Sequence, residues 1–189
     1  SLVRKHGPAA DAIVLLGDLG CTRPLREELG DLAGRTWFIL GNHDGDDPGH
    51  LLATLDLAER NLHGKVVDIC GLRVAGLGGV FRGQIWMPPF GSQPEEIRWR
   101  TREEYLAATN PKRRWMGGPP TKHWATIWPE DVEQLLALGP ADVLVTHEAP
   151  ESHRYGFRIL GDLARVLDAR LLVHGHHHDA YQAELEGGV

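Results

Sequence analysis

The sequence predicts an α/β fold, and two observations support this class. Short apolar runs read as buried strands at residues 11–16, 36–40, 142–147 and 170–174. Segments 23–33, 49–60, 129–138 and 158–168 have apolar residues at helical spacing or a helix-start signal, and they follow or precede those strands. Alternation of buried strands with helices is typical of α/β proteins. Residues 65–70 and 72–77 add a predicted hairpin through Gly71, and residues 180–185 alternate as a final strand.

Length and composition indicate a globular protein of one domain, residues 1–189. Hydrophobic residues make up 42% of the chain and charged residues 24%. No apolar run approaches the ~20 residues of a membrane span, and we expect no membrane partner. The N-terminus lacks the apolar core of a signal peptide, and Cys21 and Cys70 suggest no disulfide framework, so we expect a cytoplasmic location.

The least regular stretch is residues 81–124, which holds six of the twelve prolines and four of the six tryptophans. We expect a functional insertion or lid with one helix near residues 94–108. The stretch carries eight Lys or Arg against four Glu, whereas the whole chain has a net charge of −6. Interleaved Arg and Trp suit a nucleotide or a nucleic-acid strand. The favoured interpretation is that the tryptophans anchor an irregular segment and the arginines are solvated.

Polar residues suited to metals follow four of the predicted strands. Asp18 follows the first, Asn42, His43 and Asp44 follow the second, His147 ends the third, and His176 and His178 follow the fourth. Ligands of open α/β proteins gather at the carboxyl ends of strands, so residues far apart in sequence are expected to converge. In extended backbone, side chains alternate, which predicts that His176 and His178 face one way and His177 the other.

Together Gly17-Asp18, Gly41-Asn42-His43-Asp44, His147 and Gly175-His176-His177-His178 resemble the motifs of the calcineurin-like metallophosphoesterase superfamily, in that family's order. The resemblance implies a four-layer α-β-β-α sandwich of two mixed sheets. It also implies a hydrolase that acts on a phosphomonoester or a phosphodiester by in-line attack of a metal-bridging hydroxide. Its two metals neutralise charge on the phosphoryl oxygens.

The resemblance also implies roles for the motif residues. Asp18 resembles the carboxylate that bridges two metals. Asn42, His147 and His176 resemble the other protein ligands of one metal, and His178 resembles a ligand of the second. His43 resembles the histidine that donates to the phosphate or to the leaving oxygen, with Asp44 orienting its ring. Such mixed ligands fit Mn, Fe, Zn, Co or Ni, with Mn favoured.

One part of the family pattern is missing, because no Asp-x-His motif precedes Gly17-Asp18. That motif supplies two ligands to the second metal, so we expect this chain to bind one metal well and the second weakly or not at all. We interpret the chain as truncated at the N-terminus, and truncation at the C-terminus as well is an open alternative. The alternative is a catalytically degenerate module that binds phosphate or nucleic acid through one intact metal site.

Overall fold

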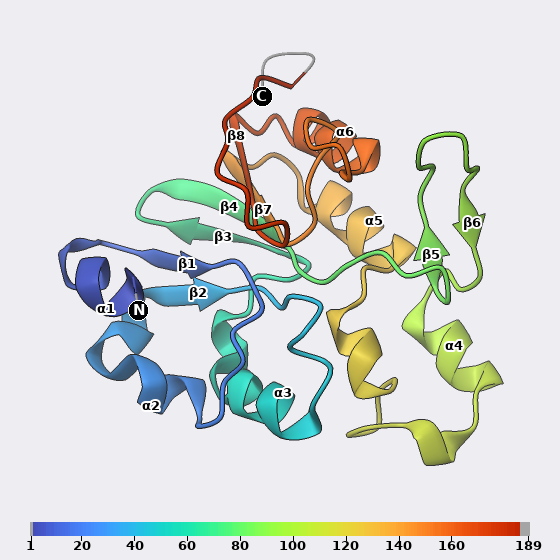
Figure 1. The fold of residues 1–189 in the computed structure, drawn as a ribbon, viewed down its shortest axis with the longest axis horizontal. Coiled ribbons are helices and arrows are strands. Elements are labelled where there is room, and N and C mark those ends of the chain that lie inside the picture. The colour runs from blue at the N-terminus through green and yellow to red at the C-terminus, as the bar shows by residue number, and fades with distance from the viewer. Residues whose placement is uncertain (1, 186–189) are drawn as a thin grey trace.

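Two sheets and their flanking helices form the body of the protein (Figure 1). The computed structural model describes residues 2–185. Its α-helices are α1 (Leu2–His6), α2 (Leu25–Leu29), α3 (Pro48–Thr54), α4 (Arg102–Ala108), α5 (Pro129–Leu138) and α6 (Arg158–Val166). Its strands are β1 (Ile13–Leu15), β2 (Thr36–Phe38), β3 (Lys65–Ile69), β4 (Leu72–Leu77), β5 (Trp86–Met87), β6 (Glu96–Ile97), β7 (Val143–Thr146) and β8 (Leu171–His174).

The larger sheet is mixed and has the strand order β3-β4-β7-β8. Strands β3 and β4 form the predicted hairpin, while β4, β7 and β8 run parallel, with Val143 of β7 paired to both Val74 and Leu171. The smaller sheet consists of β1 and β2, which are also parallel. A short antiparallel pair, β5 and β6, lies outside both sheets. Parallel pairing turns the carboxyl ends of neighbouring strands to the same edge, and this edge carries the candidate site.

Three apolar clusters separate four layers, which confirms the predicted α-β-β-α sandwich. The first cluster packs α2 and α3 against the small sheet, and Phe38 and Leu51 are fully buried in it. The second lies between the two sheets and includes Ile39 and Val145. The third packs the other face of the large sheet against α5 and α6 and includes Leu144. Because side chains alternate along β7, Leu144 and Val145 belong to different clusters.

Two predicted elements differ from the structure. A helix was expected over residues 94–108, but Glu96–Ile97 pairs with Trp86–Met87, and α4 begins only after Thr101, whose hydroxyl and Glu104 form a capping box. A strand was expected over residues 180–185, but that stretch has no strand partner. The backbone takes left-handed conformations at His176 and His178, with φ of 68° and 56°, so it leaves the extended path directly after β8.

Tryptophans anchor the 81–124 segment to the body of the protein, since Trp86 and Trp99 join the cluster of the large sheet and Trp115 and Trp124 pack on that of the small sheet. This agrees with the favoured interpretation, but its expectation of solvated arginines is wrong for Arg102, which is partly buried and paired with Asp131. Trp86 is 3% exposed and makes an edge contact with Phe81. Trp99 packs against Tyr105, and Trp115 packs against Trp124. The edge geometry of these pairs suits aromatic packing more than the open stacking platform that a nucleobase needs. Across residues 2–185, no helix is long and apolar enough to cross a membrane.

Candidate metal centre

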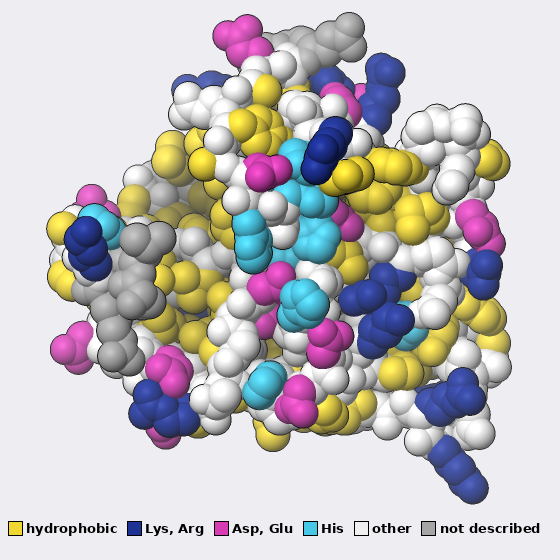
Figure 2. All heavy atoms as spheres, in the orientation of Figure 1, with side chains coloured by type: hydrophobic (Ala, Val, Ile, Leu, Met, Phe, Trp, Pro, Cys, Tyr) yellow, Lys and Arg dark blue, Asp and Glu magenta, His cyan; other side chains and the backbone are white. Residues whose placement is uncertain are grey.

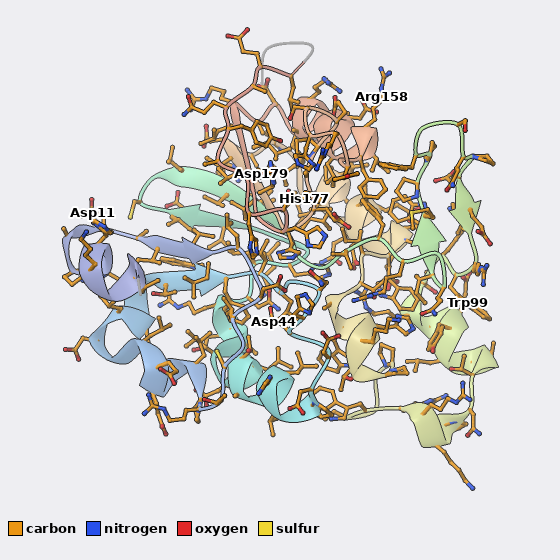
Figure 3. The ribbon with its side chains drawn as sticks, viewed as in Figure 1. Asp11, Asp44, Trp99, Arg158, His177 and Asp179 are labelled. Atoms are coloured by element: carbon orange, nitrogen blue, oxygen red, sulfur yellow. The ribbon has the colours of Figure 1, made fainter. Side chains whose placement is uncertain are left out.

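The candidate centre lies where the chain leaves β1, β2, β7 and β8. Figure 2 shows histidine side chains gathered near the middle of one face, with acidic side chains beside them. Figure 3 labels Asp44 and His177 at this place and Trp99 well away from it, beside α4. Among the described residues, Asp18, His147 and His176 bring three potential ligand atoms within 4.8 Å of one another. Three of the residues predicted from separate strand ends therefore do converge.

His147 is the buried centre of this group, with 1% of its surface exposed. Its Nδ1 lies 2.6 Å from the carbonyl oxygen of Leu16, which can only accept a hydrogen bond. Nδ1 therefore carries a proton, and Nε2 is the nitrogen that donates to Asp18 from the protonated ring or offers a lone pair to a metal from the neutral ring. Burial lowers the pKa of His147, but the hydrogen bonds to Asp18 and Leu16 outweigh burial and leave the pKa above its ordinary value. Nε2 lies 3.1 Å from Oδ1 of Asn42 and 3.4 Å from Oδ2 of Asp18. Two oxygens and one nitrogen thus face a common point, in the arrangement of a metal site whose histidine is oriented by a backbone carbonyl.

Asp18 is held in a left-handed backbone conformation with φ of 56°. Its Oδ1 accepts a hydrogen bond of 2.8 Å from the backbone N–H of His43, which leaves Oδ2 toward His147. Burial raises the pKa of the Asp18 carboxyl, but the hydrogen bonds from His147 and from the His43 backbone outweigh burial and leave the pKa below its ordinary value. The carboxylate is therefore ionised at neutral pH, as a metal ligand must be.

Glycines allow the strand ends to approach this closely. A Cβ added to Gly41 would collide with Oδ1 of Asp18 and would lie 2.5 Å from Cε1 of His147. Gly17, with φ of 94°, has the same constraint, because its Cβ would lie 2.7 Å from Nδ1 of His147. The glycines in the Gly-Asp and Gly-Asn-His-Asp motifs are thus required by the space around the ligands.

The histidines after β8 are not equivalent. His176 lies beside His147, with ring centres 5.0 Å apart, and burial followed by the charge of His147 lowers its pKa to about 4. It is neutral at pH 7 and available to a metal. His177 also lies near His176, in a second group with Glu148. His178 is exposed and belongs to neither of these two groups found among the described residues.

The predicted alternation of these side chains is therefore wrong. His176 and His178 do not share a face of an extended strand, because both residues have positive φ and the chain turns at each of them. His177 instead stacks on His153, with ring centres 4.0 Å apart and 16° between the planes.

Asp44 and His43 are both at the site, but they do not form the expected pair. Asp44 is fully buried, and its carboxylate accepts hydrogen bonds from the backbone N–H groups of Gly41, Asp18, Leu19 and Gly20. The ring of His43 is paired instead with Asp46, whose Oδ2 lies 2.8 Å from Nδ1. The expectation that Asp44 orients His43 is corrected: Asp44 holds the two motif loops together, and Asp46 contacts the ring.

Two further residues belong to this neighbourhood and were not predicted as site residues. Glu148, directly after His147, is 5% exposed, and burial raises the pKa of its carboxyl to about 7. Its Oε2 lies 3.9 Å from Nε2 of His176. Arg82 donates through Nη2 to the backbone carbonyl of Asn42 at 3.4 Å. Glu148 follows a motif histidine, so its position was a usable signal, whereas only the fold brings Arg82 to Asn42.

The donor set fits a divalent cation of the transition series. Asp18 and Asn42 offer oxygens, His147 and His176 offer neutral nitrogens, and the Nε2 of His147 already faces both oxygens. Such mixed ligands suit Mn, Fe, Zn, Co or Ni more than an all-oxygen ion.

Comparison with known proteins agrees with this centre. The sequence profile described as calcineurin-like phosphoesterase matches residues 1–180. The chain is 42% identical over 174 residues to an uncharacterized protein of Haemophilus influenzae, covering 90% of this chain and 74% of that protein. Its fold is similar to the crystal structure of TT1561 of Thermus thermophilus, with a TM-score of 0.51, 16% identity and coverage of 90% of this chain and 72% of the other. With a match across nearly its whole length and motif residues converging on one centre, the chain belongs to the calcineurin-like phosphoesterase family.

Proposed function

We propose that the protein hydrolyses a phosphate ester, a monoester or a diester, with the help of a divalent cation bound by Asp18, Asn42, His147 and His176. The observation that carries this proposal is the position of His147 Nε2, which faces Oδ1 of Asn42 and Oδ2 of Asp18 while Nδ1 is occupied by Leu16. When bound, the cation lowers the pKa of a water and neutralises charge on the phosphoryl oxygens. Manganese is the favoured metal.

The protein contributes a preformed ligand geometry. Asp44 ties the loop after β1 to the loop after β2 through three backbone N–H groups of the first loop, and a fourth, from Gly41, holds its own loop. Buried His147 is fixed from the other side by Leu16. Preorganised ligands and donors need no rearrangement during the reaction, which is the main protein contribution to electrostatic catalysis.

His43 is the proposed proton donor to the leaving oxygen. Its Nδ1 is hydrogen-bonded to Asp46, so Nε2 is the nitrogen that can reach a phosphate ester. The hydrogen bond to Asp46 and the charge of Asp18 raise the pKa of His43 above its ordinary value. This favours the protonated ring, in which Nε2 carries a hydrogen to donate.

The direct test is turnover of p-nitrophenyl phosphate and bis-p-nitrophenyl phosphate with added manganese. We expect hydrolysis of at least one substrate, abolished by a chelator and restored by the metal. His147→Ala should lose both metal binding and turnover, whereas His50→Ala, outside this centre, should lose neither. Metal binding without turnover of either substrate would favour the second candidate.

That second candidate is a catalytically degenerate module that binds phosphate or nucleic acid through one metal site. The exposure of His178 and its absence from both ligand groups favour it, because a second metal then lacks a predicted ligand. Replacement of Arg113 and Arg114 with Ala tests the nucleic-acid role of the 81–124 segment. Unchanged KM for phosphodiesters and unchanged affinity for single-stranded nucleic acid would exclude that role.

A further inference from the structure

Arg82 comes from the 81–124 segment, yet the fold carries it to the metal centre. The backbone before it is held on both sides: the N–H of Gly79 donates to the carbonyl of Leu40 at 2.6 Å, and the N–H of Val80 donates to the carbonyl of Ala125. The N–H of Phe81 donates to Glu148 at 3.3 Å. Leu40 lies directly before the Gly-Asn-His-Asp motif, and Glu148 lies directly after His147. The backbone that leads to Arg82 is therefore held between two loops that carry candidate ligands.

The guanidinium of Arg82 is partly buried but poorly paired. Nη2 makes one long hydrogen bond, 3.4 Å, to the carbonyl of Asn42. Nε is buried from solvent and has no hydrogen-bond partner among the described residues. Burial lowers the pKa of Arg82, and the charges of Asp46 and Glu148 oppose this effect without an ion pair at contact distance among residues 2–185.

Arg102 shows how another partly buried guanidinium of this chain is paired. Arg102 comes from the same segment, and it contacts Glu130 at 2.7 Å and both carboxylate oxygens of Asp131 at 2.6 and 3.0 Å. Its charge is therefore satisfied within the fold. Leaving a half-buried guanidinium without such partners costs free energy, and an anion at the site would recover it.

We propose that Arg82 binds a non-bridging oxygen of the substrate phosphate and makes the enzyme prefer phosphomonoesters over phosphodiesters. This inference rests on the proposed function, since it assigns a substrate class to the same centre. Asn42 links the metal centre to Arg82: its side-chain oxygen faces His147, and its backbone carbonyl accepts a hydrogen bond from Nη2 of Arg82. An anion held at the ligands therefore lies within reach of the guanidinium.

The preference follows from counting oxygens. A phosphomonoester has three non-bridging oxygens and up to two negative charges, whereas a phosphodiester has two such oxygens and one charge. With His43 at the leaving oxygen and the cation on one non-bridging oxygen, a diester leaves Arg82 one oxygen that shares a single negative charge. A monoester leaves two oxygens and up to twice the charge, so the guanidinium stabilises the monoester more. A guanidinium can hold such oxygens with two N–H groups, which a lysine ammonium does not match in geometry.

The test compares Arg82→Gln and Arg82→Lys with Arg98→Gln as the matched control. Arg98 lies in the same segment, but its side chain is exposed and paired with Glu96 at 2.8 Å. Titration calorimetry on the manganese-loaded protein measures the affinity for inorganic phosphate, and kcat and KM are measured on p-nitrophenyl phosphate and bis-p-nitrophenyl phosphate. Manganese affinity and thermal unfolding of each variant report whether the centre is intact.

We expect Arg82→Gln to weaken phosphate binding and to lower kcat/KM on the monoester by about tenfold or more, the range for hydrogen bonds to charged groups. The kcat/KM on the diester should change by less than about threefold. For phosphate affinity and for kcat/KM on the monoester, Arg82→Lys should lie between Arg82→Gln and wild type. Manganese affinity and the Arg98→Gln control should be unchanged. Equal losses on both substrates, or unchanged phosphate affinity in Arg82→Gln, would overturn the proposal.

The two proposals fail in different ways. Absence of turnover in wild type would contradict the proposed function, yet the phosphate titration would still decide the role of Arg82. Turnover that depends on manganese but not on Arg82 would leave the function standing and remove this residue from it.

Discussion

The Nδ1 atom of His43 lies 2.8 Å from Oδ2 of Asp46, three residues further along the chain. Both side chains are more than half exposed, at 70% and 60%. The carboxylate between them in sequence, Asp44, is instead fully buried under four backbone N–H groups. The two carboxylates look interchangeable in the sequence but make different contacts. Asp46 pairs with the ring of His43, and Asp44 binds the backbone of the loops that carry the candidate ligands.

Asp44→Asn and Asp46→Asn should therefore separate stability from catalysis. In Asp44→Asn, the amide NH₂ group faces backbone donors, and each N–H left without an acceptor costs about 1–3 kcal/mol of unfolding free energy. In Asp46→Asn, we expect stability within about 0.5 kcal/mol of wild type, as for an exposed side chain. Its kcat should fall about tenfold because the Asn amide can still accept from Nδ1 but lacks the negative charge that favours the protonated ring of His43. Urea unfolding measures the stability of each variant, and steady-state kinetics measure its kcat. A loss of kcat in Asp44→Asn alone would contradict the assignment of Asp46 to the His43 ring.

Metal binding should distinguish the three consecutive histidines. His176→Ala removes a neutral imidazole from the group with Asp18 and His147, and we expect it to abolish tight binding. His177→Ala should leave the affinity nearly unchanged, and so should His178→Ala, whose side chain is exposed. Elemental analysis of the purified protein should give one tightly held divalent ion per chain. Two tightly held ions, or equal losses from His176→Ala and His177→Ala, would refute the assignment.

Gly41→Ala should damage the metal centre without changing any ligand. The new methyl group would collide with Asp18 and with the ring of His147, so one of the two must move. Overpacking of this kind costs about 1–3 kcal/mol. We expect a lower midpoint of thermal unfolding and weaker manganese binding. Gly83→Ala is the control, because a Cβ there meets nothing within 4 Å, and it should leave both quantities unchanged.

The pH dependence of stability should depend on Asp131. Burial raises its pKa, but His63 and Arg102 outweigh burial and lower it well below the ordinary value of 3.8. Stability from this lowered pKa is fully present above pH 3.8 and is lost as the pH falls toward the pKa of the folded state. At pH 7, Asp131→Asn should lose about 3 kcal/mol, the low end of the range for breaking buried ion pairs, since Arg102 is 31% exposed.

The measurement is urea unfolding of wild type and Asp131→Asn between pH 7 and pH 3. The difference between them should narrow below pH 3.8, because wild type loses the stability from its ionised carboxylate while the variant has none to lose. A difference that stays constant over this range would show that the ionised carboxylate is not the source of the stability.

Local pattern was sufficient for most strands and for the residues at their ends. Apolar runs long enough to be buried predicted β1, β2, β7 and β8, and Asp18, Asn42 and His147 follow three of those strands. Pattern was insufficient where long-range contacts compete with local preference. Glu96 and Ile97 pair with β5, the N–H groups of Arg98 and Trp99 donate to the carbonyl of Ile85, and α4 begins only after its cap at Thr101. Residues 180–185 alternate in the sequence but have no neighbouring strand to pair with.

By itself the sequence determined the α/β class, the order of the motifs and the set of candidate ligands, because these depend on hydrophobic periodicity and on which residues follow each strand. Only the tertiary structure decided which carboxylate faces His43, which histidine after β8 joins Asp18 and His147, and that Arg82 reaches Asn42. Those outcomes depend on left-handed turns and on contacts between residues up to 131 positions apart, such as Leu16 and His147. No local pattern encodes such contacts, since packing of the two sheets brings the loops together.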